Sequence, residues 1–506
     1  MVLVGEPLNL ESILAVARHG RAVGLSQGAR ERLERCRAYV ERLLREGRRV
    51  YGVTTGFGRL AQVRIPPSEV RSLQRNLLLS HAMGVGENLP QDVVRAMLLL
   101  RAQSLALGHS GVRPELVELL LEMLNRGVHP VVPAQGSVGA SGDLAPLAHL
   151  ALPLLGEGFA EYAGEVLPGG EALRRAGLSP IGLEAKEGLA LINGTQAMTA
   201  LGLLTLADAL SAAKVADVAL AMSLEAIRGS LRPFFPQVFR LRPHPGAARV
   251  GENVLKLCQG SEIMRSHENC PKVQDPYSFR AAPQVHGASR DALEHALEVL
   301  LREANAVTDN PLLFPEEDLV LSAGNFHGQP VALAMDYAKI ALAELASISE
   351  RRTEKMLDPA FSGLPAFLAV QGGLHSGLMI SQYTAASLVS ENKVLAHPAS
   401  VDSIPTSANQ EDHVSMGTTA ARHARMVLEN LRHVLAIEVR VALEALEYRR
   451  PLRAGRGVEA VRQVLREAIP PLKEDRFLAL EHARVHALLF SGDLLARVEA
   501  AVGPLA

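Results

Sequence analysis

Three unusually long segments with helical periodicity constrain the fold of this chain more than any other feature; they cover residues 195–230, 327–357 and 417–448. Apolar side chains recur at helical spacing in the second and third segments, as in Met335, Ala338, Leu342 and Leu345, and in Leu428, Leu431, Leu435 and Val439. Asp336 and Lys339 fall on a different face. Helices of this length predict an all-α fold in which long rods pack as a bundle.

The first of these segments is the most apolar long stretch of the chain, but it is interrupted by charges. Asp208, Lys214, Asp217 and Glu225 all lie within it. A membrane-spanning helix of this length would carry few or no charges. The segment is therefore predicted to be a buried helix of a soluble fold.

Shorter elements can also be placed. Residues 26–47 and 114–126 are each typical of an amphipathic helix, the first with Ser26 as N-cap and the second with Pro114 near its start and Gly127 after its end. Convincing strands are scarce and are expected only near 158–167 and 312–321. Gly and Pro concentrate in the connections at 51–58, 131–142, 268–287 and 396–417. Long loops of this kind on a helical scaffold are where function is expected.

Composition excludes several classes of function. The net charge of the 506 residues is −2, which gives no electrostatic argument for binding nucleic acid or an anionic membrane. The three cysteines, Cys36, Cys258 and Cys270, are too few and too scattered for a disulfide framework or a zinc site. The N-terminus lacks the basic region of a signal peptide. A cytoplasmic protein fits these features best.

The loop Val132–Gly142 crowds small residues around Ala140, Ser141 and Gly142, and Asp143 then opens a helix-like run. A nucleophile elbow would need Gly where Asp143 stands, and a phosphate-binding loop would need a Lys after the glycines. The remaining simple interpretation is a flexible turn before a helix capped by Asp143.

Ala140-Ser141-Gly142, followed by Asp143-Leu-Ala-Pro-Leu, closely resembles the active-site motif of the aromatic amino acid ammonia-lyases. In that family Ala-Ser-Gly cyclises by itself into 4-methylidene-imidazol-5-one (MIO): the Gly amide nitrogen attacks the Ala carbonyl and two waters are lost, one of them from the Ser side chain. The resemblance runs from about residue 10 to the 460s, and its further motifs are YGVTTGFG at 51–58, NLLLSH at 76–81, EGLALINGT at 187–195, QDPYSFR at 274–280 and GNFHG at 324–328.

Within this family, Ser80-His81 and the stretch 400–413, SVDSIPTSANQEDH, resemble the members that act on histidine. The resemblance implies elimination of ammonia from L-histidine to give trans-urocanate, the first step of histidine degradation, with no metal and no diffusible cofactor. It also implies a fold like that of the fumarase–aspartase superfamily, with an N-terminal head at residues 1–200 carrying the MIO loop and an elongated helical body at 201–506. A homotetramer with active sites shared between subunits is expected, and long apolar helices favour such symmetric association.

The same motifs suggest roles for individual residues. Tyr51 is the expected base for the β-hydrogen, and its phenol would need a cationic or dipolar neighbourhood to lower its pKa. Asn193 is expected to hydrogen-bond the MIO carbonyl, although Asn-Gly alone is typical of a turn. Arg280 would clamp the substrate carboxylate in a bidentate pair, and a surface Arg is its alternative.

The remaining candidate site residues would position the substrate and read its side chain. Gln274 and Tyr277 would place the substrate or MIO, with Tyr277 counted among the catalytic residues, and Phe326 would pack beside the group. His81 and Glu411 would recognise the imidazole, because a benzene ring would leave both polar groups unpaired. Whether the substrate amine or its imidazole attacks MIO stays open.

Three alternatives remain. The nearest is a tyrosine or phenylalanine ammonia-lyase or aminomutase with the same MIO, which His81 and Glu411 argue against. A serine hydrolase or amidase with a free Ser141 nucleophile belongs to another class, and an intact mass distinguishes it because MIO formation removes two waters. A purely structural helical protein is disfavoured by polar motifs gathered in separate loops.

Overall fold

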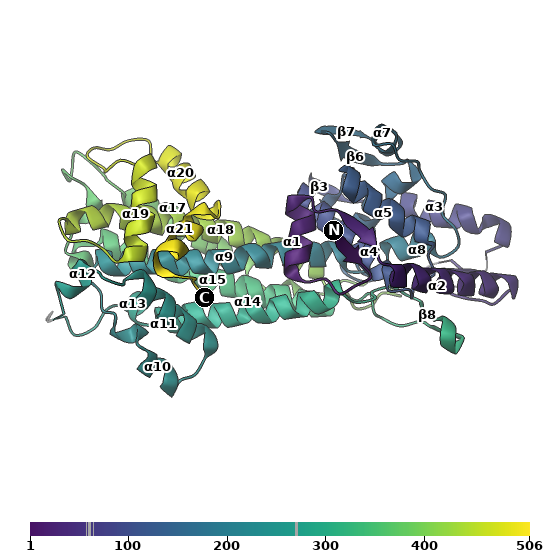
Figure 1. Ribbon diagram of the computed structural model, residues 1–506, viewed down its shortest axis with the longest axis horizontal. Helices are drawn as coiled ribbons and strands as arrows, with labels where there is room; N and C mark the ends of the chain where they lie inside the picture. The colour runs from purple at the N-terminus through teal and green to yellow at the C-terminus, as the bar shows by residue number, and fades with distance from the viewer. Residues whose placement is uncertain (57, 59–61, 64, 269–271) are drawn as a thin grey trace. The chain divides into compact units, whose positions relative to one another are not determined.

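The computed structural model describes the chain except residues 57, 59–61, 64 and 269–271, so Phe57 of the 51–58 motif and Cys270 lie outside the described residues. Helices dominate, and the strands that occur are at most four residues long (Figure 1). This confirms the predicted all-α class.

The chain forms two compact units, each described by itself. The first contains Met1–Thr205, Leu297–Asp336 and Pro398–Arg422, and the second contains Leu206–Ala296, Tyr337–His397 and His423–Ala506. Both units draw on segments far apart in the sequence. The division into head and body at residue 200 was made on the family resemblance and stays a prediction.

The helices of the first unit are α1 (Leu10–His19), α2 (Gln27–Arg45), α3 (Val70–His81), α4 (Gln91–Ala106), α5 (Pro114–Arg126), α6 (Leu144–Ala151), α7 (Gly169–Arg175) and α8 (Glu187–Ile192). Those of the second are α10 (Pro236–Leu241), α11 (Pro245–Leu257), α12 (Glu262–Arg265), α13 (Tyr277–Arg280), α16 (Pro359–Ser362), α17 (Met379–Leu395), α19 (Arg456–Ala468), α20 (Leu478–Phe490) and α21 (Asp493–Val502). Four long helices have residues in both units: α9 (Gln196–Ala226), α14 (Ala282–Ala304), α15 (Gln329–Leu357) and α18 (Gly417–Ala445).

The long helices α9, α15 and α18 confirm the three long segments predicted from periodicity. The apolar residues assigned to one face of α15 and to one face of α18 are all buried. Asp336 and Lys339 are buried as well. The Asp336 carboxylate accepts from Ser400 N at 2.7 Å, and the Lys339 ammonium donates to the His397 carbonyl at 2.9 Å. The second face of α15 is therefore packed too, with its charged side chains hydrogen-bonded to backbone groups.

The charge of Asp217 inside α9 is compensated by cationic and polar side chains. Asp217 is fully buried and accepts from Arg290 at 2.6 Å and from Asn253 at 2.8 Å, and it also pairs with His286 at 2.8 Å. Across the part of the chain that the structure describes, none of the helices has the length and apolar character needed to cross a membrane. This agrees with the prediction of a buried helix.

Local end signals place the shorter helices correctly. Ser26 caps α2 by accepting from Ala29 N, and α5 begins at Pro114 and ends before Gly127, whose φ of 72° closes the helix in the left-handed region. The two expected strand regions form hairpins, β6 (Phe159–Tyr162) with β7 (Glu165–Pro168) and β8 (Leu312–Phe314) with β9 (Leu319–Leu321).

Among the described residues, five further short strands were not predicted, because they pair with strands distant in the sequence and not across a local hairpin. They are β1 (Val2–Val4), parallel to β2 (Val23–Leu25); β3 (Val85–Asn88), antiparallel to β5 (Pro133–Gln135); and β4 (His129–Pro130), which joins β6. The β3–β5 pair matters for function, because β5 leads directly into residues 136–143.

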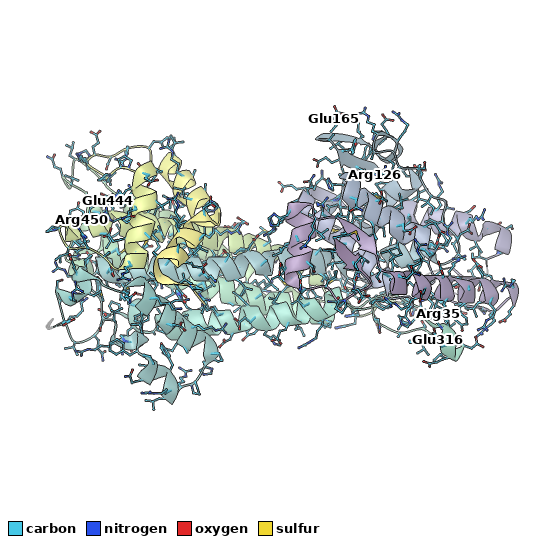
Figure 2. The ribbon with its side chains drawn as sticks, in the orientation of Figure 1. Arg35, Arg126, Glu165, Glu316, Glu444 and Arg450 are labelled. Carbon is cyan, nitrogen blue, oxygen red and sulfur yellow. The ribbon has the colours of Figure 1, made fainter. Side chains whose placement is uncertain are left out.

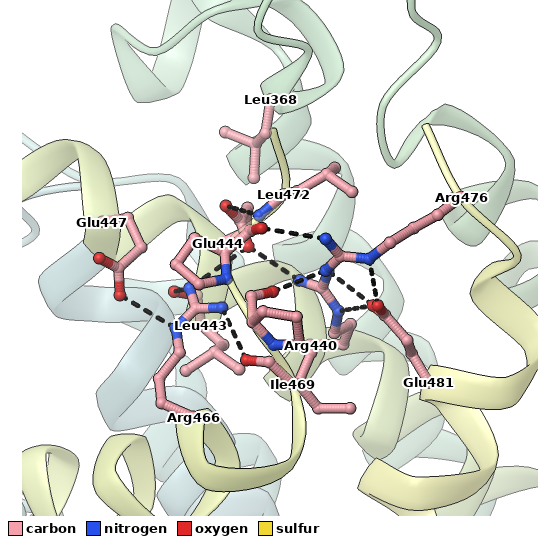
Figure 3. Close-up of polar contacts among 12 residues, drawn as sticks. Leu368, Arg440, Leu443, Glu444, Glu447, Arg466, Ile469, Leu472, Arg476 and Glu481 are labelled. Atoms are coloured by element: carbon pink, nitrogen blue, oxygen red, sulfur yellow. Dashed lines mark hydrogen bonds and ion pairs between the residues drawn. The ribbon is translucent and has the colours of Figure 1, made fainter. Parts of the chain in front are cut away.

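Several of the charged residues that form ion pairs are labelled in Figure 2. An example is the exposed pair Arg35–Glu316, whose atoms lie 3.3 Å apart. Such surface pairs contribute little to stability. A different arrangement occurs within the second unit, where Arg440 bonds both Glu444 and Glu481 among largely buried side chains (Figure 3).

Candidate active site

Gly142 lies in a backbone environment that excludes any side chain. Its φ is 73°, and a Cβ placed there would come 2.1 Å from the carbonyl oxygen of Gly194. Gly142 pairs with Gly194 in a bridge, and the next amide, Asp143 N, donates to the Gly194 carbonyl at 2.7 Å. Two distant segments, 140–143 and 193–196, are therefore held backbone to backbone.

Asp143 stands at the N-cap position of α6, but its side chain does not cap that helix. One carboxylate oxygen accepts from Ser137 at 2.8 Å and from Thr418 at 2.5 Å, and the other accepts from Met198 N at 2.8 Å. The simple cap expected from sequence is thus wrong. Burial raises the pKa of Asp143, and these hydrogen bonds oppose that effect. The carboxylate ties the 137–143 loop to the first turns of α9 and α18.

Asn193, which follows α8, donates its amide N–H to the carbonyl oxygen of Ser141 at 3.0 Å. Its own amide oxygen is buried with no hydrogen-bond partner among the described residues. The guanidinium of the fully buried Arg101 donates to the backbone carbonyl of Asn193 at 2.9 Å and to the side-chain oxygen of Gln196 at 2.9 Å. An orphaned buried amide oxygen is costly and marks a site with a purpose other than stability.

The Ser141 hydroxyl donates to one carboxylate oxygen of Glu411 at 2.8 Å. The other oxygen accepts from the Thr406 hydroxyl at 2.6 Å. Residues 406 and 411 also pair through their backbones, with Thr406 N donating to the Glu411 carbonyl at 2.9 Å and Glu411 N donating back at 3.2 Å. Glu411 is therefore held firmly with one oxygen aimed at position 141.

Tyr51 lies in the same region, and its hydroxyl accepts from Gly58 N at 3.2 Å. Burial raises the pKa of Tyr51, the Gly58 N–H lowers it, and the charges of Glu411 and Asp309 raise it further. The Gly58 N–H supplies a dipole that lowers this pKa, but among the described residues the charged groups that act on it, Glu411 and Asp309, are carboxylates and raise it.

His81 is the last residue of α3, and its Nδ1 lies 3.0 Å from the Ser80 hydroxyl. Burial lowers the pKa of His81, whereas a backbone hydrogen bond to Leu77 and the charge of Glu411 raise it. The charge of Glu411 therefore raises the pKa of both His81 and Tyr51, although His81 is not among the residues that line the cavity described next.

A cavity of about 450 Å³ opens beside Ser141. Among the predicted residues it is lined by Tyr51, Ala140, Ser141, Asn193, Phe326 and Glu411. Sequence reasoning assigned no role to three of its other lining residues, Asn310, His327 and His413. His327 and His413 stand inside motifs that were recognised, and their rings stack with centroids 5.7 Å apart. Polar residues within those motifs were the signal that could have found them.

Gln274, Tyr277 and Arg280 belong to the second unit and are not among the residues that line this cavity. Arg280 stacks on the Tyr277 ring with its guanidinium carbon 4.7 Å from the ring centre. Tyr277 is 73% exposed, and Asp275 anchors their loop by accepting from Ser230 N at 2.6 Å. These three residues form a group of their own within the second unit.

The residues around position 141 fit an MIO group. Gly142 adopts a positive φ that glycine accepts readily, and no Cβ would be tolerated there, as the cyclisation of this residue with Ala140 requires. Asn193 already donates to the Ser141 carbonyl, which is the oxygen that stays as the ring carbonyl after cyclisation. The Asn193 amide oxygen, which has no hydrogen-bond partner among the described residues, can accept a further hydrogen bond once residues 140–142 have cyclised.

Comparison with known proteins agrees with this site. The family model for aromatic amino acid lyases matches residues 8–467. The histidine ammonia-lyase of Gloeobacter violaceus is 59% identical over 506 residues, covering 100% of this chain and 98% of that protein. The crystal structure of histidine ammonia-lyase from Trypanosoma cruzi superimposes with a TM-score of 0.91 at 43% identity, covering 99% of this chain and 95% of that one.

The tyrosine aminomutase of Streptomyces globisporus is also similar in structure, with a TM-score of 0.95, 37% identity and complete coverage of both chains. These neighbours confirm the long-helix fold, like that of the fumarase–aspartase superfamily, that the resemblance implied. On the match of the family model and the full-length relatives, the chain belongs to the aromatic amino acid lyase family.

Proposed function

We propose that this protein removes ammonia from L-histidine without oxidation, giving trans-urocanate as the first step of histidine degradation, and that Ala140, Ser141 and Gly142 cyclise to MIO beforehand. Family membership and the name of the relative at 59% identity support the reaction. The observation that carries the proposal is the contact pattern at position 141, where Asn193 holds the carbonyl and Glu411 faces the side chain.

The MIO group, once formed, supplies an electrophile for the substrate. The chain's own residues do the rest. Asn193 donates to the carbonyl oxygen at position 141, where negative charge develops, and Arg101 keeps that amide in place. Tyr51 takes the β-hydrogen of the substrate, and its raised pKa makes the phenolate a strong but sparsely populated base.

His81 and Glu411 select the side chain of the substrate. Glu411 accepts an imidazole N–H, and its charge favours a partly cationic ring. Phe326 packs beside the reacting group within the same cavity. A phenyl ring would leave both polar groups unpaired, which supports large discrimination.

Binding the carboxylate of the substrate calls for a cationic side chain, and the described residues that line this cavity include no Arg or Lys. We assign this task to Gln274, Tyr277 and Arg280 of a neighbouring subunit, in a cytoplasmic homotetramer with shared sites. The exposure of Tyr277 and its stacking with Arg280 support this role, since the Tyr277 ring is presented outward and the partly buried Arg280 lies against it. In this assembly residues 1–200 act as the head that carries MIO and residues 201–506 as the helical body.

Mixing two inactive variants tests the shared site. Ser141→Ala and Arg280→Ala subunits, dissociated and reassembled together, should regain part of the wild-type activity, because some sites then combine an intact position 141 with an intact Arg280. Each variant reassembled alone is the control. Confirmed mixed oligomers with no recovery would place the whole site in one chain.

The proposed reaction is tested by incubating the protein with L-histidine and following the ultraviolet absorbance of urocanate, with L-phenylalanine and L-tyrosine in parallel. The structural similarity to a tyrosine aminomutase makes these controls necessary. Preference for histidine supports the proposal. Preference for tyrosine or phenylalanine would overturn the substrate while leaving MIO chemistry intact, and a serine hydrolase would show an unmodified Ser141.

A further inference from the structure

The turn between Thr406 and Glu411 has an unusual backbone. Ser407, Ala408 and Asn409 follow one another with φ angles of 51°, 50° and 65°. Residues other than glycine avoid this left-handed region, and a run of three is rarer still. The backbone pairing of residues 406 and 411 closes the turn and keeps it strained. Strain of this kind persists only where the surroundings enforce it, and it gathers at functional sites.

The strained turn places two side chains from its ends against each other. The Thr406 hydroxyl donates to Oε2 of Glu411 at 2.6 Å, and the Ser141 hydroxyl donates to Oε1 at 2.8 Å. Both carboxylate oxygens therefore serve as acceptors. Glu411 is fixed by one short contact from its own turn and by a second from the 140–142 loop.

Only one of these two hydrogen bonds to Glu411 remains after MIO has formed. Cyclisation of residues 140–142 removes the Ser141 hydroxyl as water, so Oε1 loses its donor. The Thr406 hydroxyl is not part of that chemistry and keeps its hold on Oε2. The carboxylate then presents a single open oxygen in a fixed direction, which suits one imidazole N–H.

We propose that Thr406 is a positioning residue: its hydroxyl holds Glu411 so that Oε1 meets the imidazole of the substrate, and it thereby sets the preference for imidazole over phenyl side chains. This inference rests on the proposed function and extends it to a residue that does not line the cavity. Thr406 acts only through Glu411, so its removal weakens recognition of the ring and leaves recognition of the substrate's carboxylate unchanged.

The test compares binding of two acrylates that differ only in their ring, trans-urocanate and trans-cinnamate, measured by calorimetry on the assembled protein. Thr406→Val keeps the shape of the side chain and deletes the hydroxyl. It should weaken urocanate about tenfold, since hydrogen bonds to charged groups are among the strong ones, and change cinnamate less than about twofold. A dissociation constant does not depend on the fraction of folded protein, so partial misfolding would not imitate this result.

Three further variants sharpen the comparison. Thr406→Ser retains the hydroxyl and should bind urocanate within about threefold of wild type. Thr384→Val makes the same isosteric change at an exposed hydroxyl that bonds its own helix carbonyl, Ile380, and should change neither ligand. In a Glu411→Ala background, Thr406→Val should add no further loss, because coupled residues are not additive.

Equal weakening of both ligands by Thr406→Val, or no weakening of urocanate, would overturn the inference. Failure of the proposed function would look different. A wild-type protein that does not turn over histidine, but in which Thr406→Val still separates urocanate from cinnamate, would contradict the reaction and support the role of Thr406.

Discussion

Two polar clusters of this molecule differ in how completely their polar groups are hydrogen-bonded. The Ser141 cluster is made of Ser141, Asn193, Thr406 and Glu411. In it two hydroxyls donate to the carboxylate of Glu411, and the side-chain amide of Asn193 donates to the backbone carbonyl of Ser141. The Arg440 network, made of Arg440, Glu444, Arg466 and Glu481, joins guanidinium groups to carboxylates in the second unit (Figure 3).

The Arg440 network is saturated with partners. Arg440 reaches Glu481 at 2.9 Å and Glu444 at 3.1 Å, and Arg466 reaches Glu444 at 3.3 Å. The second Glu444 oxygen accepts from Leu472 N at 2.9 Å. By contrast, the Ser141 cluster leaves the Asn193 amide oxygen without a partner among the described residues and includes a strained turn. A buried cluster in which every polar group has a hydrogen-bond partner indicates a structural role. A cluster that keeps an unpaired polar atom and a strained backbone indicates a site prepared for a reacting group.

The largest effect on activity should come from Ser141→Ala. The hydroxyl is required for the electrophile, so activity should fall to near background, while the melting temperature should stay within a few degrees of wild type, because only one hydrogen bond to Glu411 is lost. Activity assays and thermal unfolding check both parts. Substantial remaining activity would show that position 141 is not the source of the electrophile.

Tyr51→Phe should reduce kcat by about 10²–10⁴, the range typical of a general base. Burial and carboxylate charge raise the pKa of Tyr51, so in wild type the phenolate fraction, and with it kcat/KM, should climb from neutral pH into the alkaline range. A pH profile of both proteins measures this. Wild-type kcat/KM that is flat over that range would assign the base to another group.

Glu411→Ala should lower kcat/KM for histidine by roughly 10²-fold or more, because the imidazole loses a charged partner in a buried cavity. His81→Leu should weaken histidine turnover and admit some phenylalanine. The measurement is kcat/KM for histidine and phenylalanine in each variant. Parallel losses for the two substrates would assign Glu411 and His81 to folding instead of side-chain recognition.

Arg440→Met should show the reverse pattern, with the smallest effect on activity. Breaking a buried ion pair leaves carboxylates without their partner, so the free energy of unfolding should fall by about 3–5 kcal/mol. The kcat of the folded enzyme should stay within about twofold. Denaturant unfolding measures the loss of stability, and steady-state kinetics measures kcat. A large loss of kcat would contradict the purely structural role given to the Arg440 network.

Sequence alone predicted the features that depend on local patterns. The limits of α5 followed from Pro114 and Gly127, and the buried face of α18 followed from its 3.6-residue period. The strands β1 to β5 could not be predicted, because they pair with strands far away in the sequence, whereas the equally short β6–β7 and β8–β9 form local hairpins. Their pairing depends on tertiary packing instead.

For the candidate site, the sequence offers candidate residues and says nothing of the contacts between them. Motifs singled out Ser141, Asn193 and Glu411, but the contact between residues 141 and 411 joins segments 270 positions apart and has no local signal. The charges of Glu411 and Asp309 that raise the pKa of Tyr51 come from distant loops and have no local signal either. Thr406 lies inside the recognised stretch 400–413, but only the contact of its hydroxyl with Glu411 shows what it does.

The most direct test of the account is the mass of the peptide that spans residues 140–142 in freshly purified, active protein. The account predicts a wild-type peptide lighter than its sequence by two water molecules, and a Ser141→Ala peptide without the MIO modification. A fully active wild-type protein whose peptide has the unmodified mass would contradict the central claim that Ala140, Ser141 and Gly142 form the electrophile.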